Sequence, residues 1–87
     1  MNRPNRCPFQ WLYLGTLNLA YNKLSERLIR LFGHHGDFTR RMNNFRITIN
    51  QAEHSWRHGT SAECLVLLDR ALVIKFTLDA LIDPLLN

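Results

Sequence analysis

The chain has 87 residues, a formal net charge of +4 and a hydrophobic fraction of 46%. A chain of this length forms one small domain, which buries roughly two thirds of its unfolded surface and is marginal on its own. Glycine (4) and proline (3) are scarce and the hydrophobic fraction is ordinary for a globular protein, so the composition indicates neither disorder nor low complexity.

The two cysteines, Cys7 and Cys64, do not form a disulfide framework. They favour a reduced chain in the cytoplasm, although a single Cys7–Cys64 bridge remains an alternative. Arg3 and Arg6 precede an apolar run over residues 9–20, but polar residues interrupt that run and no small-residue cleavage site is evident. Because no uncharged apolar stretch approaches about 18 residues, we expect no membrane span.

The first predicted element is a helix over residues 9–32 that ends at Gly33. Its apolar positions repeat with helical spacing: Phe9, Leu12/Tyr13, Leu17, Ala20/Tyr21, Leu24, Leu28 and Leu31/Phe32. Residues 33–36, Gly-His-His-Gly, form a short connection. Residues 1–8 are expected to be a loose N-terminus.

A second helix is predicted over residues 38–57, with Asp37 as its N-cap. One face forms an apolar seam spaced 4, 3, 4, 3, 4: Phe38, Met42, Phe45, Ile49, Ala52 and Trp56. The opposite face is polar, with Ile47 as the outlier. Gly59 ends this helix.

The third helix is predicted from Ser61 to Asp83, because Thr60 and Glu63 fit a capping box and Pro84 disfavours continuation. One apolar stripe is expected to face the second helix: Leu67, Ala71, Ile74, Leu78, Leu81 and Leu85. A second apolar group projects from roughly the opposite side: Leu65, Leu72, Val73, Phe76 and Ala80. The predicted fold is all-α, either a three-helix bundle or a helical hairpin plus an N-terminal helix, in a single domain over residues 1–87.

A helix that is apolar nearly all round is either buried or covered by a partner. Since a chain this short has little with which to cover its last helix, we expect that helix to bind another protein or a second copy of the chain. The expected partner-binding residues are Leu65, Leu68, Leu72, Phe76 and Ala80. The alternative is that the first helix closes over this surface.

The second helix supports a different function. Residues 1–60 hold nine Lys/Arg against three acids, whereas residues 61–87 hold two against four. Arginine and asparagine on the polar face of helix 38–57 are residue types that contact base edges. A basic helix-turn-helix regulator that binds DNA is therefore the alternative function, with these candidate residues: Arg40, Arg41, Asn43, Asn44 and Arg46.

Enzymatic and metal-dependent functions have weaker support. His54 and His58 share one helix face, but they do not form a His-Glu-x-x-His motif and no third ligand follows at a recognisable spacing. Cys64 lies in the first turn of a helix, where a thiol pKa falls, yet it also projects near the apolar seam. We therefore expect no enzymatic activity, no metal and no cofactor.

The amphipathic helix ending in Arg57-His58-Gly59, the turn Thr60-Ser61-Ala62-Glu63 and the final apolar helix form a hairpin. Over residues 38–86 it resembles the small helical-hairpin co-chaperones of type III secretion needle subunits. The first 36 residues lie outside the resemblance, and the basic charge departs from it. The resemblance implies a cytosolic, non-enzymatic protein that shields an aggregation-prone helical partner. Together these observations predict a small protein-binding module, either adaptor- or chaperone-like or homo-oligomeric.

Overall fold

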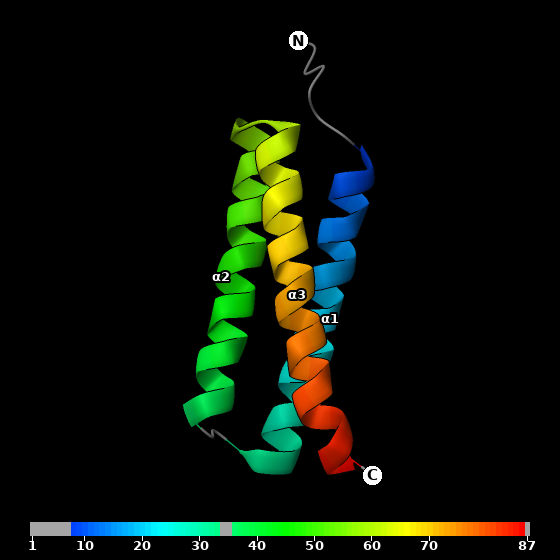
Figure 1. The fold of residues 1–87 in the computed structure, drawn as a ribbon, viewed down its shortest axis with the longest axis vertical. Helices are drawn as coiled ribbons and strands as arrows, with labels where there is room; N and C mark the ends of the chain where they lie inside the picture. The colour runs from blue at the N-terminus through cyan, green and yellow to red at the C-terminus, as the bar shows by residue number, and fades with distance from the viewer. Residues whose placement is uncertain (1–7, 34–35, 87) are drawn as a thin grey trace.

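The computed structural model describes residues 8–33 and 36–86, without the side chains of residues 32, 85 and 86. It contains three helices: α1 (Pro8–Phe32), α2 (Gly36–His58) and α3 (Ser61–Leu86). They form a bundle that is 48 Å long and 21 by 17 Å across (Figure 1). The all-α, three-helix prediction is therefore confirmed, and no strand occurs among the described residues.

The helices run up and down along the rod, so α2 is antiparallel to both α1 and α3 (Figure 1). Short connections between helices favour this arrangement because they leave no length for a crossover. Gly33 ends α1 with a left-handed φ of 66°, and its N–H bonds to the Ile29 carbonyl at 2.9 Å. The amino-terminal ends of α1 and α3 meet where the Gln10 amide donates to the Ser61 carbonyl at 3.1 Å.

The predicted seam of α2 packs into the core. Met42, Phe45, Ile49 and Ala52 are buried, and the seam's two end residues, Phe38 and Trp56, are half-buried against them. Ile47 is 51% exposed, as its place on the polar face predicts. Thr48 is buried although the sequence analysis did not place it in the core. Its hydroxyl donates to the Asn44 carbonyl at 2.8 Å, which satisfies the polar group inside the helix.

The buried stripe of α3 differs from the predicted one. It consists of Cys64, Leu68, Ala71, Leu78 and Ile82, with Leu67 and Ile74 half-buried beside it. Leu81 was predicted to be core, but it is 40% exposed; Leu85 lies outside the described side chains. The prediction considered only contacts with α2. Because α3 also packs against α1, the buried side of α3 is centred closer to residues 64, 68 and 82 than predicted.

The buried stripe of α1 also differs in part. Leu17, Leu24 and Leu28 are buried as predicted, but Leu14 joins them, while Phe9 and Leu12 are 79% and 66% exposed. Leu31 is likewise exposed. The apolar residues of α1 surround much of the helix, so their spacing alone did not identify the buried face.

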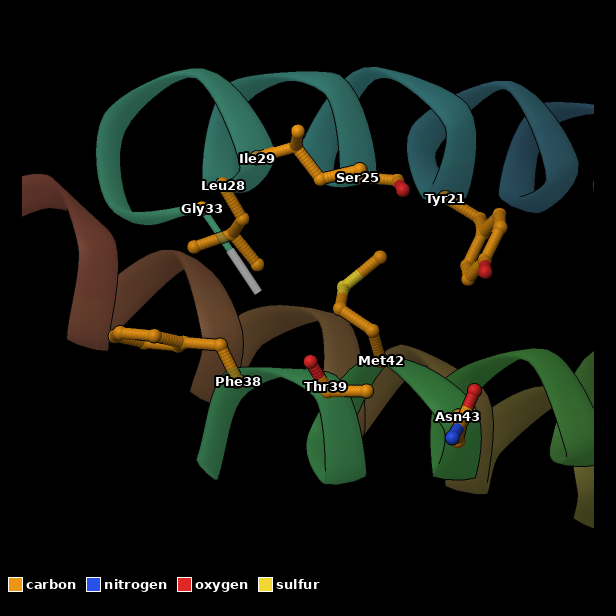
Figure 2. Close-up of a pocket in the computed structure, with 9 residues that line it drawn as sticks. All are labelled: Tyr21, Ser25, Leu28, Ile29, Gly33, Phe38, Thr39, Met42 and Asn43. Atoms are coloured by element: carbon orange, nitrogen blue, oxygen red, sulfur yellow. The ribbon is translucent and has the colours of Figure 1, made fainter. Parts of the chain in front are cut away.

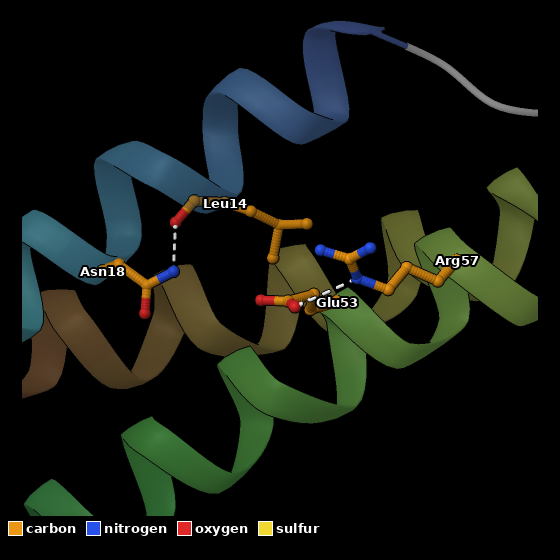
Figure 3. Close-up of polar contacts among 4 residues, drawn as sticks. All are labelled: Leu14, Asn18, Glu53 and Arg57. Carbon is orange, nitrogen blue, oxygen red and sulfur yellow. Dashed lines mark hydrogen bonds and ion pairs between the residues drawn. The ribbon is translucent and has the colours of Figure 1, made fainter.

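A tryptophan cluster fixes α1 against the end of α2. The rings of Trp11 and Trp56 have centroids 4.5 Å apart, and the Arg57 guanidinium lies 5.0 Å from the Trp11 ring. Arg57 is oriented by Glu53, which accepts its Nε–H at 3.1 Å (Figure 3). Within α1, the Asn18 amide donates to the Leu14 carbonyl at 3.1 Å (Figure 3).

The helix ends confirm the predicted Thr60–Glu63 capping box, but they differ from the predicted start of α2 and the predicted end of α3. The Glu63 carboxylate accepts from the Thr60 N–H at 3.0 Å, and the Thr60 hydroxyl receives the Glu63 N–H at 3.1 Å, which forms the expected capping box. Asp37 is not the N-cap of α2, because that helix already begins at Gly36 and Asp37 lies in its first turn. Pro84 does not end α3 either. A proline in the final turn removes one helical hydrogen bond, and the exposed carbonyl of Ala80 can be solvated instead.

Candidate protein-binding surface

The surface of α3 that points away from the core is largely apolar. We call it the outer face, and it consists of Leu65, Val66, Leu72, Val73, Phe76 and Ala80. Val66, Val73 and Ala80 are separated by seven residues each, so they lie in one row along the helix. The side chains of Leu65, Val66, Val73 and Phe76 are 52%, 57%, 63% and 57% exposed. Neither α1 nor α2 therefore covers this row.

Four of the five expected partner-binding residues belong to this surface. Leu65, Phe76 and Ala80 are exposed and Leu72 is half-buried at its edge. Leu68 is a correction: it is 2% exposed and belongs to the hydrophobic core, to which all three helices contribute. Val66 was missed, although its spacing of seven residues from Val73 could have identified it.

Acidic residues lie among and beside the apolar side chains of the outer face. Asp69 is exposed between Val66 and Val73, three and four residues from them, and Asp83 is exposed farther along α3. Lys75 and Asp79 form an ion pair at 2.8 Å with both side chains about one third exposed or less, and the Lys75 ammonium lies 5.3 Å from the centre of the Phe76 ring. The outer face thus combines exposed apolar side chains with Asp69 among them and with charged residues of both signs at its border.

Burying the outer face would release substantial free energy. Removing the remaining exposed area of one such side chain from water contributes roughly 1–2 kcal/mol. The four exposed side chains of the outer face, Leu65, Val66, Val73 and Phe76, are enough to contribute to a helix–helix contact, since clustered exposed apolar side chains mark interaction surfaces. The arrangement can therefore bind an apolar helix, although it carries no group that performs chemistry.

The candidate nucleic-acid-binding residues of α2 are all exposed. They are Arg40, Arg41, Asn43, Asn44 and Arg46. Arg40 approaches the Asp37 carboxylate only to 4.0 Å. The expected helix-turn-helix geometry differs from what is observed, because α1 and α2 lie side by side and antiparallel along the rod (Figure 1), whereas helix-turn-helix elements cross at about 90–120°.

The groups considered for metal binding or catalysis do not assemble into a site within the described residues. The rings of His54 and His58 lie 5.0 Å apart, but no cluster of three metal-ligating side chains occurs there. Cys64 is a buried thiol with 0% exposure. Cys7, His34 and His35 lie outside the described residues.

A small depression separates the end of α1 from the start of α2. It has a volume of about 160 Å³ and is bordered by Tyr21, Leu28 and Ile29 from α1 and by Phe38 and Met42 from α2 (Figure 2). Its polar side chains, from a tyrosine, a serine, a threonine and an asparagine, are not arranged as a nucleophile with a base (Figure 2). The depression does not change the assignment of the outer face as the main candidate site.

Two further findings bear on the chain as a whole. Across residues 8–33 and 36–86, none of the helices has the length and apolar character needed to cross a membrane. Comparison with family models, curated proteins and solved structures finds no match for the chain. Its function is therefore argued from its own surfaces.

Proposed function

We propose that the protein is a small protein-binding module whose outer face packs against an apolar helix of another protein or of a second copy. The exposed row Val66, Val73 and Ala80, extended by Leu65 and Phe76, carries the proposal. A monomer with no binding role would leave these side chains in water without compensation. An adaptor- or chaperone-like role in the cytoplasm, without enzymatic activity, fits a chain whose main exposed feature is an apolar helix face.

The test uses Phe76→Asp, with Leu19→Asp as the matched control. Phe76 is 57% exposed on the outer face, whereas Leu19 is 62% exposed on α1. Both changes place a carboxylate at an exposed position, so circular dichroism should show helicity close to that of the wild type. Sedimentation equilibrium and affinity capture from native extract should show an assembly that Phe76→Asp removes and Leu19→Asp retains.

Two results would count against the proposal. One is a wild-type protein that stays monomeric and captures only the proteins that Phe76→Asp also captures. The other is unfolding of Phe76→Asp, which would identify Phe76 as a core residue. A second outer-face variant, Val73→Asp, separates these cases, because Val73 is 63% exposed.

Nucleic-acid binding is the second candidate function, and the exposure of all five candidate residues on α2 favours it. Arg40→Ala or Asn44→Ala should then weaken binding to duplex DNA, and the affinity should fall steeply with added salt because phosphate contacts release counterions. Absence of binding to any oligonucleotide at low salt would exclude this function.

A further inference from the structure

A groove runs between α2 and α3 beside the outer face, and Val73 of the outer face also borders it. One part is a hollow of about 250 Å³ bordered by Arg41 and Asn44 on α2 and by Ile74 on α3. The other is a wider hollow of about 550 Å³ bordered by Ile47 on α2 and Leu67 on α3. No residue of α1 borders either hollow. Because both lie between the same two helices, we treat them as one surface, the α2–α3 groove.

The floor of the α2–α3 groove is apolar and only partly covered. Leu67 and Ile74 are half-buried at the edge of the core, and Ile47 is 51% exposed on the facing wall. Leu67 and Ile74 are seven residues apart on α3 and therefore lie on one line. A second apolar helix seated between α2 and α3 would cover this line.

The charged side chains at the two hollows are cationic. Arg41 borders the first hollow directly, and Arg70 lies on the line that joins Leu67 to Ile74, three and four residues from them. No acidic residue borders either hollow. Two carboxylates lie one helical turn beyond the hollows, and both have partners on their own helices: Asp37 approaches Arg40 at 4.0 Å, and Glu63 accepts hydrogen bonds from Thr60. The charged side chains at the hollows themselves are thus cationic.

The length of the groove suits one helix. From Arg41 to Ser55, the part of α2 that borders it rises about 21 Å at 1.5 Å per residue, which is about four helical turns. We propose that the α2–α3 groove binds a single amphipathic helix of a partner protein, whose apolar stripe is flanked by acidic residues. Its apolar side chains contact Leu67, Ile74 and Ile47, and its carboxylates pair with Arg41 and Arg70. This is helix-in-groove recognition with a defined charge preference.

The probes are two synthetic peptides of about 18 residues, long enough to span four turns. Both peptides have leucines at i, i+3, i+4 and i+7. The positions that flank this stripe are glutamates in one peptide and lysines in the other, and all remaining positions are alanine. The full-length protein should bind the glutamate peptide about ten-fold more tightly in fluorescence anisotropy, because two exposed ion pairs replace two like-charge contacts.

Charge reversal is the decisive step. Arg41→Glu/Arg70→Glu should invert the preference, whereas Arg30→Glu/Arg46→Glu, an equal change in net charge at exposed positions that border neither hollow, should leave it intact. Ile47→Asp should weaken binding of the glutamate peptide, and circular dichroism should confirm that each variant folds. Phe76→Asp should have no effect, because Phe76 borders neither hollow. It therefore separates the outer face from the groove, whereas Val73→Asp would affect both surfaces.

The proposal is overturned if neither peptide binds, if both bind equally, or if the preference survives reversal of Arg41 and Arg70. It is also overturned if the control pair inverts the preference to the same extent, because net charge then explains the binding. Self-association of the wild type that Arg41→Glu/Arg70→Glu abolishes would assign the groove to a second copy instead of a partner.

Discussion

Leu68→Ala and Leu65→Ala apply the same chemical change at two positions three residues apart on α3. Leu68 is 2% exposed and Leu65 is 52% exposed. Since the gain in helix propensity is the same at both positions, the difference between their effects reports only burial and packing. Both residues were predicted to bind the partner, so this pair tests the rotation of the buried face of α3.

The expected effects differ several-fold. Truncating a fully buried leucine costs about 2.7–5 kcal/mol through lost transfer free energy and the cavity that remains. For Leu65 about half of the side chain is already in water, so we expect a loss of less than about 1 kcal/mol. In a domain of this size each 1 kcal/mol lowers the Tm by about 4–8 °C. Leu68→Ala should therefore melt at least about 10 °C below the wild type, and Leu65→Ala within about 8 °C of it.

Urea and thermal unfolding followed by circular dichroism at micromolar concentration measure both variants. The two should also differ in binding: Leu65→Ala should weaken capture of the partner, whereas Leu68→Ala should act through stability. Equal destabilisation, or a larger effect of Leu65→Ala, would refute the assignment of Leu68 to the core and of Leu65 to the outer face.

Two further matched pairs test local features. Gly59→Ala should destabilise the protein by about 1–2 kcal/mol, because the new Cβ would lie 2.9 Å from Glu63 Oε1 and 3.1 Å from the Ser55 carbonyl oxygen. Gly15→Ala should stabilise α1 by up to about 1 kcal/mol, because a Cβ at Gly15 would meet no atom within 4 Å beyond its chain neighbours and the backbone of its own helix, and alanine favours the helix. Chemical denaturation compares them, and destabilisation by Gly15→Ala would contradict the open surroundings of Gly15. A double-mutant cycle of Lys75→Met and Asp79→Asn should give a coupling of about 0.5 kcal/mol that declines in 1 M salt, as expected for a pair about one third exposed or less. A coupling that is unchanged by salt would argue against an ion pair.

The elements of the fold were predictable because each carries local evidence. The seam of α2, the glycine stop at residue 33 and the Thr60–Glu63 capping box follow from spacing and end residues, and all three are present. The burial of α3 was less predictable. Its apolar residues occur around most of the helix, so either of two neighbouring stripes could face inward, and only the position of α1 decides between them.

The candidate site was predictable to a similar degree. Leu65, Phe76 and Ala80 were correctly placed outside the core, since they project opposite the stripe that contacts α2. Leu68 was misplaced because the contribution of α1 to the core cannot be read from the pattern of α3 alone. The α2–α3 groove was not predicted, because it depends on which residues of α2 lie beside which residues of the antiparallel helix α3.

The three helices do not share their contacts equally: α2 and α3 pack against each other most extensively, and α1 packs least against α3. A helix with fewer buried contacts opens at a lower free energy, so its backbone amides become accessible to solvent before those of the other helices. Amide hydrogens of α1 should exchange through a partial opening that leaves the α2–α3 hairpin intact, with Trp11 leaving Trp56 as its first step. The resulting hairpin would expose Leu68 and Cys64, so the surface that this protein offers depends on whether its first helix is docked.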